Sequence, residues 1–451
     1  MPKRLFGTNG VRGVVNDFMD PQLALDVGRA IGTFMKGRVA MATDCRTSAD
    51  MIRSAVAAGL ASVGCEVLDL GALPTPALQY FVKVGEISGG VMVTASHNPP
   101  EFNGIKAIDA DGTEMHRSRE EEIERIYFSR SFDQKDWKGV GAIKPASGAM
   151  ENYQKAVLSL MDIDAIRKAR LRVVLDCANG AGSLCSPVLL QRLGASALTL
   201  NCNPEGTFPG HPSEPVEENL VDLISLVEES GADLGIAQDG DADRAIFIDD
   251  KGRYVHGDRS LAVVAAAMVS ENEGGVVVTP VSTSQCVEDA VRAAGGEVVY
   301  TRVGAPIVAR RMMELGAVFG GEENGGLIFP RHQYCRDAAM SMAKMLEIVA
   351  IEGSLSSALA KVPAYHLDKR KLRCPDERKE RVLREVCEAF SANKIDTTDG
   401  VKVYFEGGWS LVRPSGTEPI FRVYSEGKDK ATAKRIADRC EKVVKEILGE
   451  Q

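Results

Sequence analysis

Short apolar runs of strand length recur along most of the chain, and each is followed by a loop rich in glycine or polar residues. The runs are Gly90–Val93, Leu171–Leu175, Leu234–Ala237, Val276–Val278 and Ala317–Phe319. Helical patterns separate the successive strand units. Strands that alternate with helices are typical of parallel α/β layers. We therefore expect an α/β protein in which three regions repeat one architecture.

Helix signals agree with these strands. Asp20 followed by Pro21 is typical of an N-cap and first helical turn, and apolar residues then recur at helical spacing as far as Phe34. Residues 401–427 differ, because they predict three short strands with no helix between them. A helix over Lys430–Leu448 follows. The last part of the chain is therefore expected to be a smaller α+β unit with antiparallel strands.

The length of 451 residues exceeds one ordinary core and predicts three or four domains. We place the boundaries near residues 150, 252 and 368. The predicted domains are 1–150, 151–251, 252–367 and 368–451.

Composition excludes several classes of protein. Apolar residues make up 44% of the chain, but none of their runs approaches the roughly 20 residues of a membrane helix. The longest, Leu261–Val269, is expected to be a buried helix segment. The N-terminus lacks the apolar core of a signal peptide, so a cytoplasmic location is expected. The ten cysteines form no C-x-x-C pair and are expected to be free thiols.

The formal charge of −9, with no basic arm or stripe, argues against a nucleic-acid partner. An anionic substrate would require basic residues concentrated in particular loops. The loops after the strands are the place to look, because ligands of open parallel sheets bind at the carboxyl ends of the strands.

The first such loop, TASHNPP, contains Ser96 and His97 and is followed by Lys106. A serine nucleophile needs a base or a metal to activate it. The alternative is a turn fixed by Asn-Pro-Pro, in which Ser96 only bonds its own backbone. An α/β-hydrolase is disfavoured because the G-x-S-x-G elbow is absent.

The second loop, DGDADR, places three carboxylates at alternating positions, Asp239, Asp241 and Asp243. Such a set suits Mg²⁺ or Ca²⁺. An EF-hand does not fit, because Arg244 occupies its glycine position and a strand precedes the loop. The alternative, a solvated acidic turn, would leave three like charges close together with nothing positive between them.

Two further loops have weaker individual signals. GGEENGG, with Glu322, Glu323 and Asn324, would let a ligand approach the backbone and accept hydrogen bonds from sugar hydroxyls, or it is simply a glycine-rich hairpin. RPSGTEP is a candidate anion cradle, or a turn in a small β unit. The cradle residues are Arg413, Ser415, Gly416, Thr417 and the nearby Arg422.

Taken together, the four loops resemble the α-D-phosphohexomutase family over essentially the whole chain. TASHNPP resembles its phosphoserine loop, DGDADR its metal loop, GGEENGG its sugar loop and RPSGTEP its phosphate loop. The opening FGTNGVRG, which includes Arg12, is similar to the N-terminal signature of the family. The resemblance implies three similar mixed α/β domains and a smaller α+β domain around a central cleft.

The resemblance also implies roles for individual residues. Ser96 would carry the phosphoryl group and, with the three aspartates, hold one Mg²⁺. Arg12, Arg244 and Lys106 would balance the negative charge, and Lys106, or else His97, would be the general acid/base. Glu322, Asn324 and the segment at Arg302 would face the sugar. The non-reacting phosphate would be held by Arg413, Ser415, Gly416, Thr417 and Arg422.

The implied reaction interconverts hexose 1-phosphate and 6-phosphate through a hexose 1,6-bisphosphate, which also serves as activator. Reorientation of this intermediate predicts a mobile fourth domain. The GGEENGG form resembles the archaeal-type branch and favours phosphoglucosamine mutase, with phosphomannomutase/phosphoglucomutase second. Glu323 is a candidate partner for a protonated 2-amino group. The sequence departs from many relatives in two segments. Asn324 and Gly326 stand in place of serine and histidine, and residues 302–305 begin with Arg302 and end with Ala305, where relatives often have lysine first and aspartate or histidine last.

Two functions from other classes stay open, a magnesium-dependent sugar phosphatase and a non-catalytic sugar-phosphate sensor. The expected partner is a small sugar phosphate, with no nucleic acid and no membrane. The protein is expected to be a monomer or a homodimer.

Overall fold

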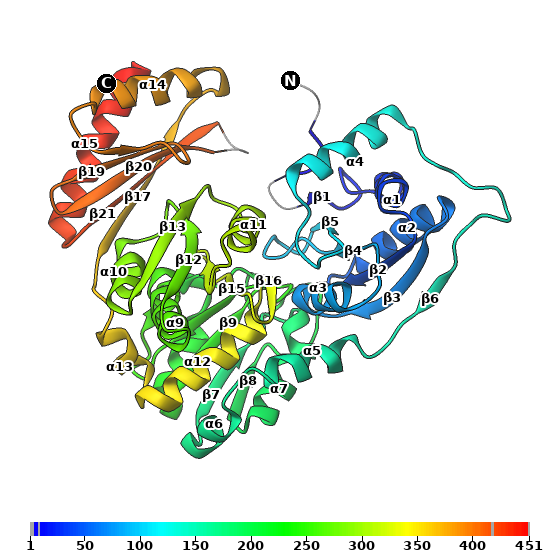
Figure 1. Cartoon of the computed structure of the whole chain (residues 1–451), viewed down its shortest axis with the longest axis horizontal. Helices are drawn as coiled ribbons and strands as arrows, with labels where there is room; N and C mark the ends of the chain where they lie inside the picture. Colours follow the sequence, from blue (N-terminus) through cyan, green and yellow to red (C-terminus); the bar gives the residue numbers. More distant parts are fainter. Residues whose placement is uncertain (1–3, 8–9, 416–418, 450–451) are drawn as a thin grey trace.

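Four β-sheets succeed one another along the chain in the computed structural model (Figure 1). The structure describes residues 4–7, 10–415 and 419–449. Three sheets are mixed and covered by helices, and the fourth is antiparallel. The predicted fold class, three mixed α/β units and a smaller α+β unit, is confirmed.

The first sheet has six strands in the order β1-β5-β4-β2-β3-β6. Its strands are β1 (Val11–Val14), β2 (Arg38–Thr43), β3 (Glu66–Ala72), β4 (Gly89–Val93), β5 (Phe102–Ile108) and β6 (Ile143–Pro145). Its helices are α1 (Pro21–Met35), α2 (Ala49–Ser62), α3 (Thr75–Val84) and α4 (Arg117–Ser129). The predicted cap of α1 is present, because the Asp20 side chain accepts a hydrogen bond from Leu23 N.

The second sheet has the order β11-β10-β9-β7-β8. Its strands are β7 (Arg172–Asp176), β8 (Ser196–Leu200), β9 (Leu234–Gln238), β10 (Ala245–Ile248) and β11 (Tyr254–Val255). Its helices are α5 (Ala149–Leu158), α6 (Ile163–Ala169), α7 (Ser186–Leu193) and α8 (Val221–Ser230), with short 3₁₀ turns at Ala181–Leu184 and Glu217–Asn219. Strand β11 lies beyond residue 252, so this sheet continues a few residues past the predicted boundary.

The third sheet has the order β13-β12-β14-β15-β16. Its strands are β12 (Gly275–Pro280), β13 (Gly296–Thr301), β14 (Phe319–Gly321), β15 (Leu327–Phe329) and β16 (Gln333–Arg336). Its helices are α9 (Gly257–Glu271), α10 (Gln285–Ala293), α11 (Ala305–Leu315), α12 (Ala338–Glu352) and α13 (Leu355–Ala360). The strand expected over Ala317–Phe319 begins two residues later, at Phe319.

The fourth sheet is antiparallel, with the order β17-β21-β20-β19-β18. Its strands are β17 (His366–Arg373), β18 (Ile395–Asp396), β19 (Val401–Phe405), β20 (Gly408–Pro414) and β21 (Ile420–Gly427). A 3₁₀ turn at Asp376–Arg378 leads into α14 (Lys379–Ala389), and α15 (Lys430–Leu448) ends the unit, over the residues predicted. Strand β17 spans the predicted boundary at residue 368, because its partner β21 lies in the last unit.

The first three units repeat one local arrangement. In each, a buried parallel strand (β4, β9 or β14) is followed by a loop and then by an antiparallel neighbour (β5, β10 or β15). The three loops that carry TASHNPP, DGDADR and GGEENGG are therefore equivalent turns of three similar sheets. A turn of this kind projects its side chains from the carboxyl end of the parallel strand, where ligands bind in such sheets.

The hydrophobic core divides differently from the sheets. One continuous cluster of buried side chains extends through the first three units and includes Leu78, Tyr153, Phe247 and Met345. The fourth unit has a separate core, and a small apolar cluster around Val281, Trp409 and Leu411 joins it to the third. Motion of the fourth unit would thus disturb far less buried apolar surface than separation of the first three.

Candidate active site

Ser96 lies in the loop after β4, fully buried, with a backbone φ of 53°. Its hydroxyl donates a hydrogen bond to Asp239 Oδ2 at 2.8 Å, and His97 Nδ1 lies 3.4 Å from the same oxygen. The Ser96 N–H donates to Thr94 Oγ1 at 2.8 Å. The structure therefore places the serine loop of the first unit directly against the acidic loop of the second.

The serine loop is held by Arg46, a residue that the sequence analysis missed. Its Nη2 donates to the carbonyl oxygens of Ser96 and Asn98 at 2.7 and 2.6 Å. Its Nη1 donates to the carbonyls of Pro99 and Phe102 at 2.6 and 2.9 Å. A planar guanidinium with four carbonyl contacts fixes the course of the loop. The only signal in the sequence was its position just after a strand.

Asp44 completes this support. The buried Asp44 carboxylate accepts hydrogen bonds from Arg46 Nε at 3.1 Å and from Thr94 Oγ1 at 2.6 Å. Because Thr94 in turn accepts from Ser96 N, the side chain of Asp44 is connected to the backbone of Ser96 through one hydroxyl.

The three aspartates of the second loop form a buried cluster. One carboxylate oxygen from each of Asp239, Asp241 and Asp243 lies within 4.8 Å of the others. Burial, and then the charges of Asp243 and Asp241, raise the pKa of Asp239 well above its ordinary value. Gly240 is required here, because a Cβ would lie 2.6 Å from the Ser96 carbonyl oxygen.

The donor set of this cluster fits a hard divalent cation. Among the described residues, Asp241 Oδ1 and Asp243 Oδ1 are buried and receive no hydrogen bond. Buried carboxylate oxygens without donors are costly unless a cation satisfies them. Three carboxylates on one loop are typical of a Mg²⁺ site with positions left for phosphate oxygens.

Lys106 extends from β5 into the same cluster and is buried. Its Nζ lies 2.7 Å from Asp241 Oδ2 and 3.5 Å from Asp243 Oδ2. Thr75 Oγ1 also donates to Asp241 Oδ2, at 2.7 Å. Burial alone would raise the pKa of Asp241, but the Lys106 charge and the hydrogen bonds from Lys106 and Thr75 outweigh it and lower that pKa.

Arg336, at the end of β16, is a second residue that the sequence analysis missed. Its Nη2 lies 2.6 Å from Asp243 Oδ2 and 3.4 Å from Glu114 Oε1, and its Nη1 lies 3.7 Å from Glu322 Oε2. It thereby connects the metal loop, the first unit and the sugar loop. No motif surrounds it in the sequence, so only the folded structure reveals it.

The other predicted basic residues surround Ser96. Arg12 Nη1 donates to Ala95 O at 3.2 Å and to Asn98 Oδ1 at 3.0 Å. Arg244 Nε lies 3.6 Å from Asp243 Oδ1. Burial, followed by the positive charges of Arg244 and Arg12, lowers the pKa of His97 to about 2, so His97 is uncharged at neutral pH.

A cavity of about 540 Å³ opens in front of these groups. It is lined by side chains from the first three units, and the expected site residues Arg12, His97, Arg244, Glu322 and Asn324 are among them. A volume of this order lies within the range of small-molecule sites. The structure thus brings the serine, metal and sugar loops to one cavity.

The sugar loop is a hairpin between β14 and β15, and its carboxylates diverge. Glu322 lines the cavity and its Oε1 accepts a hydrogen bond from Gly304 N at 3.1 Å. Asn324 also lines the cavity, while its Oδ1 accepts from Gly326 N at 3.1 Å. Glu323 is not among the lining residues, and its Oε1 accepts from Ser282 Oγ at 3.4 Å. The geometry therefore does not support Glu323 as the partner of an amino group.

The phosphate loop lies on the fourth unit, apart from this cavity. Arg413 and Arg422 are directly opposite each other on β20 and β21. Like charges in register destabilise a strand pair unless an anion or acid lies near them, and Asp399 Oδ2 accepts a hydrogen bond from Arg413 Nε at 2.6 Å. Ser415 is buried, and its N–H donates to Ile420 O at 2.9 Å. Gly416 and Thr417 lie outside the described residues.

Arg302 differs from its expected place. Its side chain is 69% exposed, and its Nε lies 3.9 Å from Asp399 Oδ1 rather than in the cavity. The following residues, Val303 and Gly304, line the cavity instead. A role of Arg302 in sugar binding stays a prediction.

Family models match the chain in four consecutive stretches. They are described as phosphoglucomutase/phosphomannomutase α/β/α domain I over residues 3–134, domain II over 151–252, domain III over 256–365 and the C-terminal domain over 371–443. Each stretch contains one of the four loops.

Whole-chain relatives agree with these models. The chain is 43% identical to a phosphoglucomutase/phosphomannomutase of Thermococcus kodakarensis, over 99% of both chains. It is 40% identical to a phosphoglucosamine/phosphogalactosamine mutase of Sulfurisphaera tokodaii, over 98% of this chain and 99% of the relative. The crystal structure of a phosphoglucomutase/phosphomannomutase family protein from Burkholderia thailandensis superposes with a TM-score of 0.89, at 26% identity, over 98% of this chain and 97% of the other.

Proposed function

Because this chain belongs to the phosphoglucomutase/phosphomannomutase family of α-D-phosphohexomutases, which are isomerases, we propose that it interconverts glucosamine 6-phosphate and glucosamine 1-phosphate. The observation that carries the reaction type is the contact between Ser96 and the buried aspartate cluster, with Lys106 inside that cluster. This arrangement provides a phosphoryl carrier, a charge-neutralising site and a proton-transfer group within one buried cluster.

In the proposed cycle, phosphorylated Ser96 gives its phosphoryl group to the free hydroxyl of the sugar phosphate. The P–O bond to Ser96 breaks as the P–O bond to the sugar forms, and the proton of the sugar hydroxyl moves to a base. The resulting hexose 1,6-bisphosphate turns around and returns its other phosphoryl group to Ser96. A trace of this bisphosphate is also the proposed activator, because it can phosphorylate an empty Ser96.

The roles of the charged groups follow from their contacts. Phosphorylation adds about −1.5 to −2 charge beside three aspartates. Asp239, Asp241 and Asp243, with a phosphoserine oxygen, would hold one Mg²⁺, which when bound supplies charge neutralisation. Arg12, Arg244 and Arg336 surround the same groups and supply further positive charge.

Lys106 is the proposed general acid/base. Its Nζ lies within the aspartate cluster, 2.7 Å from Asp241, and so beside the expected position of the phosphoryl group. His97 lines the cavity and stays the second candidate. Lys106→Met should abolish mutase turnover, whereas His97→Gln should retain part of it. The opposite ranking would assign the role to His97.

Two observations support the proposed preference for glucosamine phosphate. One is the 40% identical relative named for phosphoglucosamine and phosphogalactosamine. The other is Glu322, whose carboxylate lines the cavity and would meet a protonated amino group. The 43% identical relative favours the second candidate, a phosphoglucomutase/phosphomannomutase of broad specificity.

A substrate panel tests both proposals. Glucosamine, glucose and mannose 1-phosphates are compared by kcat/KM, with Mg²⁺ and a trace of hexose 1,6-bisphosphate. We expect the highest value for glucosamine 1-phosphate. Equal or higher values for glucose or mannose would favour the broad mutase. Steady release of inorganic phosphate would indicate a phosphatase, and binding without turnover would indicate a sensor.

A further inference from the structure

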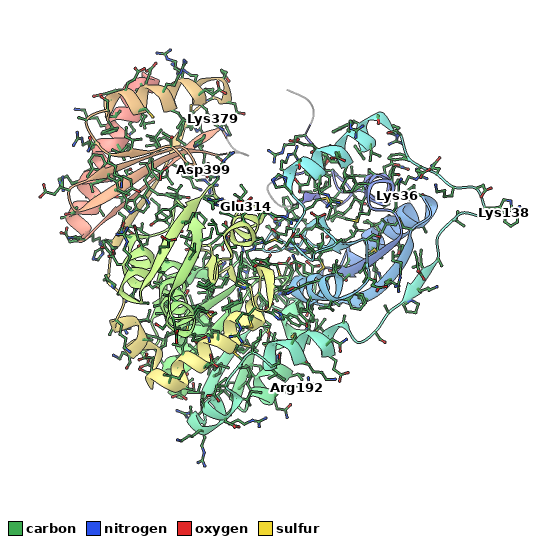
Figure 2. All side chains as sticks on the ribbon, viewed as in Figure 1. Lys36, Lys138, Arg192, Glu314, Lys379 and Asp399 are labelled. Carbon is green, nitrogen blue, oxygen red and sulfur yellow. The ribbon has the colours of Figure 1, made fainter. Side chains whose placement is uncertain are left out.

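Asp399 lies where the fourth unit faces the third (Figure 2). It occupies the turn between β18 and β19, and its side chain is only 10% exposed. A single oxygen, Oδ2, accepts a hydrogen bond from Arg413 Nε at 2.6 Å and from Val303 N at 3.0 Å. One carboxylate oxygen therefore joins the phosphate loop of the fourth unit to a backbone amide of the third.

The turn that carries Asp399 is fitted closely to the phosphate loop. Gly400 has a φ of +89°, and a Cβ there would lie 2.4 Å from Val412 O and 3.0 Å from Arg413 Cα. Glycine thus allows this turn to rest on the backbone of β20 at Arg413. The contact between Asp399 and Arg413 is built into the packing of the unit.

On the other side, Asp399 bonds a segment that belongs to the sugar site. Val303 and Gly304 both line the cavity. Gly304 N donates to Glu322 Oε1 at 3.1 Å, and Glu322 contacts Arg336, which contacts Asp243. A continuous series of polar contacts therefore runs from Arg413 to the metal loop, and Asp399 is its link between the third and fourth units.

We propose that Asp399 is a positioning residue that sets the phosphate loop at a fixed place relative to the sugar loop. A substrate with one phosphate at Ser96 and the other at Arg413 reaches from the first unit to the fourth. The distance between Ser96 and Arg413 therefore decides whether both ends are held. By holding the plane of the Arg413 guanidinium and anchoring it to Val303, Asp399 fixes that distance. The inference rests on the proposed function, because it requires a ligand with two separated anionic ends.

Two substitutions at Asp399 separate geometry from charge. Both hydrogen bonds reach the same oxygen, so the amide oxygen of Asp399→Asn can accept both while the negative charge is removed. Asp399→Ala removes the oxygen as well. Positioning by Asp399 predicts a KM for the hexose 1-phosphate about tenfold higher in Asp399→Ala, with kcat changed less than threefold. Asp399→Asn should recover KM to within threefold of wild type.

Asp396→Asn is the matched control. Asp396 ends β18, three residues before Asp399, and its Oδ1 accepts a hydrogen bond from Thr398 N that an asparagine oxygen can also accept. The variant removes one negative charge from a residue close to Asp399 in the sequence without removing the Asp399 contacts. Its KM should stay within twofold of wild type, and thermal unfolding of each variant shows whether the fourth unit has folded.

A double-mutant cycle tests whether Asp399 acts through Arg413. In an Arg413→Ala background, Asp399→Ala should change KM less than twofold, because the partner is already absent. Additive effects of the two substitutions, an unchanged KM in Asp399→Ala, or a KM in Asp399→Asn as high as in Asp399→Ala would each overturn the proposal. A wild-type protein that converts none of the hexose phosphates would contradict the proposed function, and this proposal with it.

Discussion

The hydroxyl of Ser96 donates a hydrogen bond to Asp239 Oδ2 at 2.8 Å, in a pocket with two further buried carboxylates. This contact is attractive only while Ser96 has a proton to donate. A phosphoryl group on the same oxygen replaces the donor with about −1.5 to −2 charge. Phosphorylation therefore increases the need of this aspartate cluster for a cation.

Mg²⁺ should accordingly stabilise the phosphorylated protein more than the unphosphorylated one. Thermal unfolding with and without Mg²⁺, on protein treated with phosphatase or with hexose 1,6-bisphosphate, measures the difference. A cation present at about 100 times its Kd adds about 2.7 kcal/mol to the free energy of unfolding. Asp241→Asn should remove most of the Mg²⁺ effect. An equal shift in both phosphorylation states would contradict the coupling.

Ser96→Ala should remove mutase activity and the modification together. Intact mass should show one phosphoryl increment in the wild type and none in the variant. We expect kcat to fall by at least about 10³-fold, because the proposed phosphoryl carrier is absent, while substrate affinity changes little. Ser88→Ala, a serine of the same unit outside the cavity, is the control. Retained phosphorylation in Ser96→Ala would place the carrier elsewhere.

Arg46 should be essential for the conformation of the serine loop. Arg46→Lys keeps the charge but cannot reach four carbonyls with one planar group, so the serine loop should lose its fixed course. Activity should fall about 10²-fold, and the free energy of unfolding by about 3 kcal/mol. Arg38→Lys, at the exposed start of β2, should change neither. An Arg46→Lys enzyme with wild-type kcat would show that the loop holds its course without this clamp.

Because Glu322 lines the cavity and Glu323 does not, the two residues should differ in their effect on substrate selectivity. Glu322→Gln should lower the ratio of kcat/KM for glucosamine 1-phosphate to that for glucose 1-phosphate, because a cationic amino group loses its charged partner. A loss of about 1.5–3 kcal/mol corresponds to roughly tenfold or more in this ratio. Glu323→Gln, one residue away but outside the cavity, should leave the ratio within twofold. The reverse result would mean that Glu323 enters the cavity when substrate binds.

The sequence predicted most of the architecture for a physical reason. Strands buried on both faces and amphipathic helices such as Lys430–Leu448 carry strong periodic signals, and loops after parallel strands are where ligands bind. Arg46, Arg336 and Asp399 could not be found in the same way. Each is a single charged residue whose partners lie in other segments, and no local pattern distinguishes it from a solvent-exposed side chain.

The sequence also could not predict the direction in which a loop side chain points. Glu322 and Glu323 are adjacent and chemically equivalent, yet one lines the cavity and the other contacts Ser282. The boundary near residue 368 falls within β17 for a related reason, since the pairing of β17 with β21 joins segments about 50 residues apart. Such long-range contacts leave no trace in local periodicity.

The backbone of Ser96 has a left-handed conformation, which lowers the stability of the protein. A φ of 53° is a conformation that glycine adopts freely and that a residue with a Cβ adopts at a cost of roughly 1–2 kcal/mol. A hydroxyl is nevertheless needed at this point, so chemistry and stability make opposite demands on the same residue. Ser96→Gly should unfold at a higher temperature than Ser96→Ala, although both lack the hydroxyl. The difference in unfolding temperature between these two inactive variants would measure the stability that the protein gives up for function at this one position.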